Sequence, residues 1–99
     1  MIINYTKYYN EENFCARVHF YLDELGEIGA SIYFGKKWHP APYENDIQNY
    51  MSVVLFDIYS IGHFKKWVSK IKNKNNWSEE FEKFLIKNCK SLFARRNFI

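Results

Sequence analysis

Alternation of apolar and polar residues predicts a β-hairpin in the N-terminal third of the chain. Apolar side chains occupy every second position from Phe14 to Leu22, and the same pattern resumes from Ile28 to Phe34. A period of two is typical of strands that bury one face. The intervening loop contains Gly26 and several acidic residues, as hairpin loops often do. Pairing Leu22 with Ile28 places both apolar rows on one face of the sheet, which supports this register.

The segments on either side of the hairpin are predicted from their composition. Residues 2–9, IINYTKYY, are rich in β-favouring side chains and are followed by a polar turn, so we expect a strand there. Residues 36–43, KKWHPAPY, are expected to form a loop. Pro40 and Pro42 each remove a backbone donor and restrict the preceding residue.

The stretch Asp46–Ile61 is predicted to form a central helix. Its apolar residues would share one helical face: Ile47, Tyr50, Met51, Val54, Leu55, Ile58 and Ile61. Val53 and Phe56 would lie on the opposite side. A buried fourth strand over Ser52–Tyr59 is the alternative, because Val-Val-Leu-Phe favours β-structure. The helix is preferred because its spacing persists over a length unusual for a strand.

Two further amphipathic helices are predicted in the C-terminal part. The first has apolar residues at helical spacing from Phe64 to Ile71, and a polar Asn/Lys segment follows it. The second begins after Ser78, a favourable N-cap, and carries lysines on its outer face. The predicted fold class is therefore α+β. We expect a small antiparallel sheet of about three N-terminal strands packed against two or three C-terminal helices, in a single domain of residues 1–99.

Aromatic content and charge distribution both suggest a recognition role. Aromatic residues make up 20% of the chain. Tyr and Trp are favoured at recognition surfaces, so we expect some of them to face a partner. The net charge of +3 divides unevenly. Residues 1–49 carry four basic against seven acidic residues, and residues 50–99 carry ten against four. The C-terminal half is therefore predicted to form a basic pole.

The sequence favours a cytoplasmic protein that needs no cofactor, metal or membrane. Cys15 and Cys89 do not form a disulfide framework or a zinc-ligand pattern. The N-terminus lacks the features of a signal peptide. The longest apolar run, Val53–Phe56, is too short to span a membrane.

A small histidine-dependent hydrolase or nuclease is one alternative function. Such an enzyme needs two histidines to converge on the substrate, but no local spacing connects His19, His39 and His63. Cys15 is predicted to point outward beside Arg17, which would lower the pKa of the thiol. A nucleophilic cysteine also needs a specific electropositive pocket, which no motif predicts. We therefore expect no catalytic residue and predict that the protein is not an enzyme.

Nucleic-acid binding through the basic C-terminal half is the other alternative. Clustered cations are needed for phosphate contacts, and exposed aromatic rings are needed for stacking on bases. The candidate residues surround Trp67: Lys65, Lys66, Lys70, Lys72 and Lys74. Trp67 shares the helical spacing of Phe64 and Val68, so it is expected in the core. In that case the lysines would solvate the far side of the helix.

The preferred hypothesis is a protein-binding module that uses the outer face of the hairpin. In the expected register Arg17 lies opposite Tyr33, and the Pro-containing loop adds an aromatic rim. The candidate protein-binding residues are Arg17, His19, Tyr21, Tyr33, Trp38 and Tyr43. Residues of these types are enriched at protein interfaces, although the same pattern also suits a solvated sheet face.

The expected partner is another protein, such as a bacterial toxin or effector that this chain inhibits stoichiometrically. Bacterial immunity proteins, antitoxins and phage-encoded inhibitors are typically small single domains of this kind. No stretch of the sequence matches any of those families. A homodimer through the exposed sheet face, or through Val53 and Phe56, is also compatible with the sequence.

Overall fold

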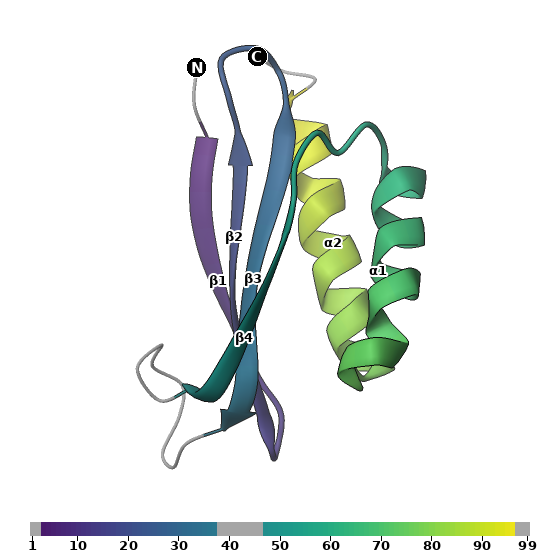
Figure 1. Ribbon diagram of the computed structural model, residues 1–99. Helices are drawn as coiled ribbons and strands as arrows, with labels where there is room; N and C mark the ends of the chain where they lie inside the picture. The colour runs from purple at the N-terminus through teal and green to yellow at the C-terminus, as the bar shows by residue number, and fades with distance from the viewer. Residues whose placement is uncertain (1–2, 38–46, 97–99) are drawn as a thin grey trace.

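The computed structural model describes residues 3–37 and 47–96 and shows a four-stranded antiparallel sheet with both helices on one side (Figure 1). The strands lie in the sheet in chain order: β1 (Ile3–Asn10), β2 (Phe14–Leu22), β3 (Ile28–Lys37) and β4 (Ile47–Leu55). The helices are α1 (Ile61–Asn75) and α2 (Glu79–Arg96). The predicted α+β class is confirmed, with one strand more than expected.

The hairpin of β2 and β3 has the register that the sequence predicts. Leu22 pairs with Ile28, and the pairing continues without interruption to Phe14 and Lys36. Several apolar residues of these two strands are fully buried: Val18, Phe20, Ile28, Ala30 and Ile32. Gly26 in the connecting loop has a φ of 83°, in the left-handed region that favours glycine.

The predicted helix over residues 46–61 is wrong, because most of this stretch forms β4. Leu55 of β4 pairs with Ala30, and Val53 pairs with Ile32. The alternative strand over Ser52–Tyr59 is closer to the structure, although β4 begins earlier and ends at Leu55.

A β-bulge explains why β4 resembles a helix in the sequence. Phe34 pairs with Met51, but Lys36 pairs with Gln48, so residues 49–50 of β4 oppose only Gly35 of β3. The extra residue interrupts the alternation of β4. Beyond the bulge, the exposed Val54 adds an apolar position on the other face, so the apolar residues of β4 fall at intervals that imitate a helical period.

The two helices have the capping interactions that their sequences permit. The Ser78 hydroxyl accepts a hydrogen bond from the Phe81 backbone N–H at 3.0 Å, which confirms Ser78 as the N-cap of α2. The Ser60 hydroxyl caps α1 in the same way, accepting from the His63 N–H at 3.1 Å. Within residues 3–37 and 47–96, no helix combines the length and apolar character needed to cross a membrane.

An aromatic cluster joins the helices to the sheet. The Phe81 ring of α2 lies with its centroid 4.9 Å from those of Tyr9 and Phe14 and 5.1 Å from that of Trp77. Cys89 is completely buried in the same core, as the sequence predicts, and burial raises the pKa of its thiol to about 12. The core therefore lies on one side of the sheet, between the strands and the two helices.

Candidate protein-binding surface

The face of the sheet that points away from the helices, called here the open face, carries alternate side chains from all four strands. The helices lie on the other side (Figure 1). Because burial of one apolar row fixes the orientation of each strand, the remaining side chains are forced onto this face. The open face includes Thr6, Tyr8, Cys15, Arg17, His19, Tyr21, Ser31, Tyr33, Ser52 and Val54.

Arg17 lies near the centre of the open face between two tyrosines. It pairs across the strands with Tyr8 on β1 and with Tyr33 on β3, as the predicted register requires for Tyr33. The guanidinium carbon of Arg17 lies 4.6 Å from the centroid of the Tyr33 ring, within the range of a cation–π interaction. Tyr8 remains 49% exposed. The stacking holds the Arg17 cation in a defined position at the surface.

His19 belongs to the neighbouring cross-strand row. Its Nδ1 lies 2.8 Å from the Thr6 hydroxyl, and its ring meets that of Tyr33 edge to face at 6.0 Å. Partial burial lowers the pKa of His19, and the nearby charge of Arg17 lowers it further. The imidazole is therefore mostly neutral at neutral pH, and the row adds polar groups without adding charge.

Tyr21 covers the backbone of β3 at Gly29, its cross-strand partner. A Cβ atom added at Gly29 would lie 2.1 Å from the Tyr21 ring. Only glycine therefore permits this close approach of an aromatic ring to the neighbouring strand. Partial burial, together with the nearby Asp23 carboxylate, raises the pKa of Tyr21, so its phenol stays neutral.

Charge is sparse on the open face. Arg17 is the single charged residue among the ten open-face residues named above. The cores of protein interfaces are depleted of charge and enriched in aromatic residues and arginine. The composition of the open face therefore resembles the centre of an interface.

The structure brings together four of the six residues that the sequence selects for protein binding. Arg17, His19, Tyr21 and Tyr33 all lie on the open face. Trp38 and Tyr43 fall outside the described residues, as does His39 of the enzyme alternative.

Sequence reasoning missed several members of the open face. Thr6 and Tyr8 lie on β1, where they alternate with Tyr5 and Tyr9. This alternation is the signal that could have placed them on the open face. Val54 was missed because its segment was predicted as a helix.

The predicted exposure of Cys15 is wrong. Cys15 has the expected orientation but is only 3% exposed. Its thiol lies 3.8 Å from the backbone carbonyl oxygen of Lys36, to which it donates. A short side chain on an internal strand, held against the neighbouring strand, leaves little sulfur for solvent to reach.

The two described histidines do not form a common site. His19 contacts Thr6 on the open face, whereas His63 lies in the first turn of α1. There the Nδ1 of His63 accepts a hydrogen bond from the Tyr59 N–H at 3.2 Å, and the two rings stack. Within the described part of the chain, no group of three His, Cys, Asp or Glu side chains is placed to hold a metal ion.

Two hollows along α2 gather basic residues, called here the basic hollows. One has a volume of about 430 Å³ and is lined by Lys65, Lys83, Ile86, Lys87 and Lys90. The other has the same volume and is lined by Tyr5, Thr6, Lys7, Lys87, Asn88, Ser91 and Arg95. Lys87 lines both, and neither is lined by an acidic residue.

The lysines that the sequence selects on α1 have different surroundings. Lys65 lines a basic hollow, but Lys72 forms an ion pair with Glu82 at 3.1 Å. Lys66, Lys70 and Lys74 are exposed. The Trp67 ring stacks on Phe64 and packs against the core, as predicted, so it is not presented for stacking on bases.

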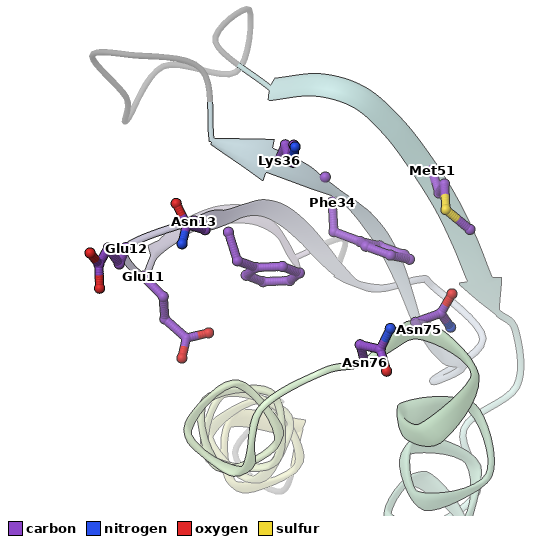
Figure 2. Close-up of a pocket in the computed structure, with 10 residues that line it drawn as sticks. Glu11, Glu12, Asn13, Phe34, Lys36, Met51, Asn75 and Asn76 are labelled. Atoms are coloured by element: carbon purple, nitrogen blue, oxygen red, sulfur yellow. The ribbon is translucent and has the colours of Figure 1, made fainter.

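A third hollow, of about 580 Å³, lies between the β1–β2 turn, β3, β4 and the end of α1 (Figure 2). Figure 2 shows the Phe34 ring projecting from β3 toward Asn75 and Asn76. Glu11 is one of the acidic residues that line this hollow, and its carboxylate already accepts a hydrogen bond from the Ser78 hydroxyl at 2.9 Å. Because Lys36 also lines it, the hollow has no consistent charge with which to select a ligand.

Comparison with known proteins assigns the chain to no family. No protein-family model, curated protein or solved structure matches it significantly.

Proposed function

We propose that this protein is a stoichiometric protein-binding module, which acts by covering part of another protein's surface with its open face. The arrangement of Arg17 between Tyr8 and Tyr33 carries this proposal. Tyrosine and arginine are the residues that most often dominate binding energy at interfaces, together with tryptophan. Here they occupy the centre of a face that neither helix covers.

The construction of the open face favours tight binding. Its side chains project from paired strands, so their backbone positions are already fixed before a partner arrives. Binding then loses less conformational entropy than it would on a flexible loop.

We further propose that the partner is an enzyme or toxin that this protein inhibits, as immunity proteins and antitoxins inhibit theirs. The placement of the open-face side chains on paired strands supports this class. An inhibitor of this kind needs one surface that matches its target, and it needs no chemistry of its own.

A pull-down from a nuclease-treated extract of the source cells tests the proposal. We expect the wild type to retain a protein partner that an Arg17→Ala/Tyr33→Ala variant loses. A Lys66→Ala/Lys70→Ala variant is the matched control, because it removes two exposed side chains from α1 and leaves the open face intact. Equal retention by all three proteins would contradict binding through the open face.

The basic hollows support a second candidate function, the binding of single-stranded nucleic acid. Their shared residue Lys87 joins six basic side chains into one surface: Lys7, Lys65, Lys83, Lys87, Lys90 and Arg95. Phosphate contacts of this kind release counterions, so the affinity should fall steeply as salt rises.

Fluorescence anisotropy with a labelled oligonucleotide, measured over a salt series, separates the two functions. For nucleic-acid binding, a Lys83→Ala/Lys87→Ala variant would weaken binding and reduce the salt slope by about 2. The Arg17→Ala/Tyr33→Ala variant would then bind normally. Absence of binding at low salt would exclude this second function.

A further inference from the structure

β4 is an edge strand that lacks the usual protection of an edge. Within the described residues no strand pairs with its outer side, since β4 ends the strand order. Residues Ile47–Leu55 contain no charged residue and no proline, which are common means of blocking an edge. The bulge lies before Met51, so it affects only the start of the strand, and Met51–Leu55 pairs regularly with β3.

Exposed apolar side chains lie on both sides of this edge. Met51 is 55% exposed and Val54 is 43% exposed. Met51 pairs with Phe34 on the helix side of the sheet, whereas Val54 pairs with Ser31 on the open face. A flat partner on one face would cover only one of them. An added β-strand would cover both and would also satisfy the unpaired backbone groups of the edge.

The other edge of the sheet differs in charge. β1 carries Lys7, and Lys87 and Arg95 of α2 line a hollow beside it. Two copies that met through β1 would bring these cations together, which is unfavourable. Two copies that met through β4 would bring together strands without charge.

We propose that β4 pairs antiparallel with β4 of a second copy, about a twofold axis perpendicular to the sheet. An antiparallel strand pair is complementary to itself under such an axis, so the same residues serve both copies. Because each chain has one permissive edge, the association closes at a dimer and does not extend into a filament. The result is one continuous sheet of eight strands, twice the four of a single chain.

The dimer places the two open faces on the same side of the joined sheet. Each copy contributes one Arg17 site, so a partner with two matching surfaces would bind with added avidity. The dimer itself does not depend on the proposed protein-binding function, since β4 and the Arg17 site occupy different strands.

Analytical ultracentrifugation over a concentration series tests the dimer, with charge introduced at one edge or the other. The wild type is expected to reach twice the chain mass of 12.0 kDa. Val54→Lys is expected to lose the dimer and sediment as a single chain. Tyr8→Lys is the matched control, because Tyr8 is similarly exposed on the open face but lies on β1, and this variant should remain dimeric.

Hydrogen exchange gives a second measurement that needs no variant. Edge amides of Met51–Leu55 that do not bond to β3 are expected to exchange more slowly as protein concentration rises. Concentration-independent exchange there would overturn the proposal, and it decides the matter if Val54→Lys fails to fold by circular dichroism. Three sedimentation results would also overturn the proposal. These are a wild type that stays monomeric, a wild type that forms assemblies larger than a dimer, and loss of the dimer in Tyr8→Lys alone.

Discussion

Replacing Gly29 with alanine is expected to change stability with a sign that depends on Tyr21. The new Cβ would lie 2.1 Å from the Tyr21 ring. Because nonbonded carbon atoms in contact lie about 3.5 Å apart or more, the ring would have to move by about 1.4 Å. Strand pairing between Tyr21 and Gly29 fixes both backbones, so the side chain has to absorb this displacement.

The expected magnitudes follow from two opposing contributions. Moving the Tyr21 ring costs about 1–3 kcal/mol. This range covers the strain of a displaced rotamer and the interaction energies measured between residues in contact. Alanine is itself favoured over glycine within a strand by about 0.5–1 kcal/mol. We therefore expect Gly29→Ala to destabilise the wild type by about 1 kcal/mol, and to stabilise a Tyr21→Ala variant by about 0.5–1 kcal/mol.

Urea denaturation of the four proteins in this double-mutant cycle measures both values. Gly62→Ala is a control in the first turn of α1, where the nearest atom to a new Cβ is the Ser60 hydroxyl at 3.7 Å. Gly62→Ala should raise the free energy of unfolding by up to about 1 kcal/mol. This increase would show that the assay can detect a stabilising substitution. If Gly29→Ala had the same sign in both backgrounds, Tyr21 would not lie over Gly29.

Three further predictions concern single residues. Asp57 has a φ of 54°, so Asp57→Gly should raise the free energy of unfolding by about 1 kcal/mol in urea titrations, and a loss would refute strain there. The buried Cys89 thiol, with its pKa raised to about 12, should react with a thiol reagent only after unfolding; rapid labelling of the folded protein would contradict this. The lowered pKa of His19 means that the unfolded chain binds more protons near and below the ordinary histidine pKa of about 6.5. The stability from neutral His19 is therefore present above that pH and lost as pH falls through it. His19→Gln should flatten this decline in the denaturant midpoint, and an unchanged decline would argue against it.

Local patterns predicted much of the fold because they matched the tertiary contacts. The apolar row from Phe14 to Leu22 is buried as a strand face, and its pairing with Ile28 follows from the alternation. Ser78 stands before an amphipathic run and caps α2 as its side chain permits. In these segments one period dominates, so the periodicity alone identifies the element.

β4 could not be identified in this way, because its position at the edge removes the signal. Val53 packs partly against the core, whereas the adjacent Val54 is 43% exposed. Two successive residues on opposite faces are therefore both apolar, which hides the alternation expected of a strand. The bulge before Met51 then shifts the alternation by one residue. An edge strand with a bulge therefore has neither a clear period of two nor a real helical period.

The same limits apply to the candidate site. Arg17 and Tyr33 could be paired from the hairpin pattern, because both lie on strands with a regular alternation. The contribution of Tyr8 depends on how β1 pairs with β2, which involves a weaker pattern. The basic hollow at Lys65 combines residues from both helices, so it depends on how α1 and α2 pack.

Calorimetric titration of the partner recovered in the pull-down tests the claim that the open face binds another protein. We expect one binding site per chain. We also expect Arg17→Ala to raise the Kd about 10- to 100-fold, in the range of interface hot spots, and Lys66→Ala to leave the Kd unchanged. An unchanged Kd for Arg17→Ala, together with a weaker affinity for Lys87→Ala, would contradict the claim and place binding on the basic hollows.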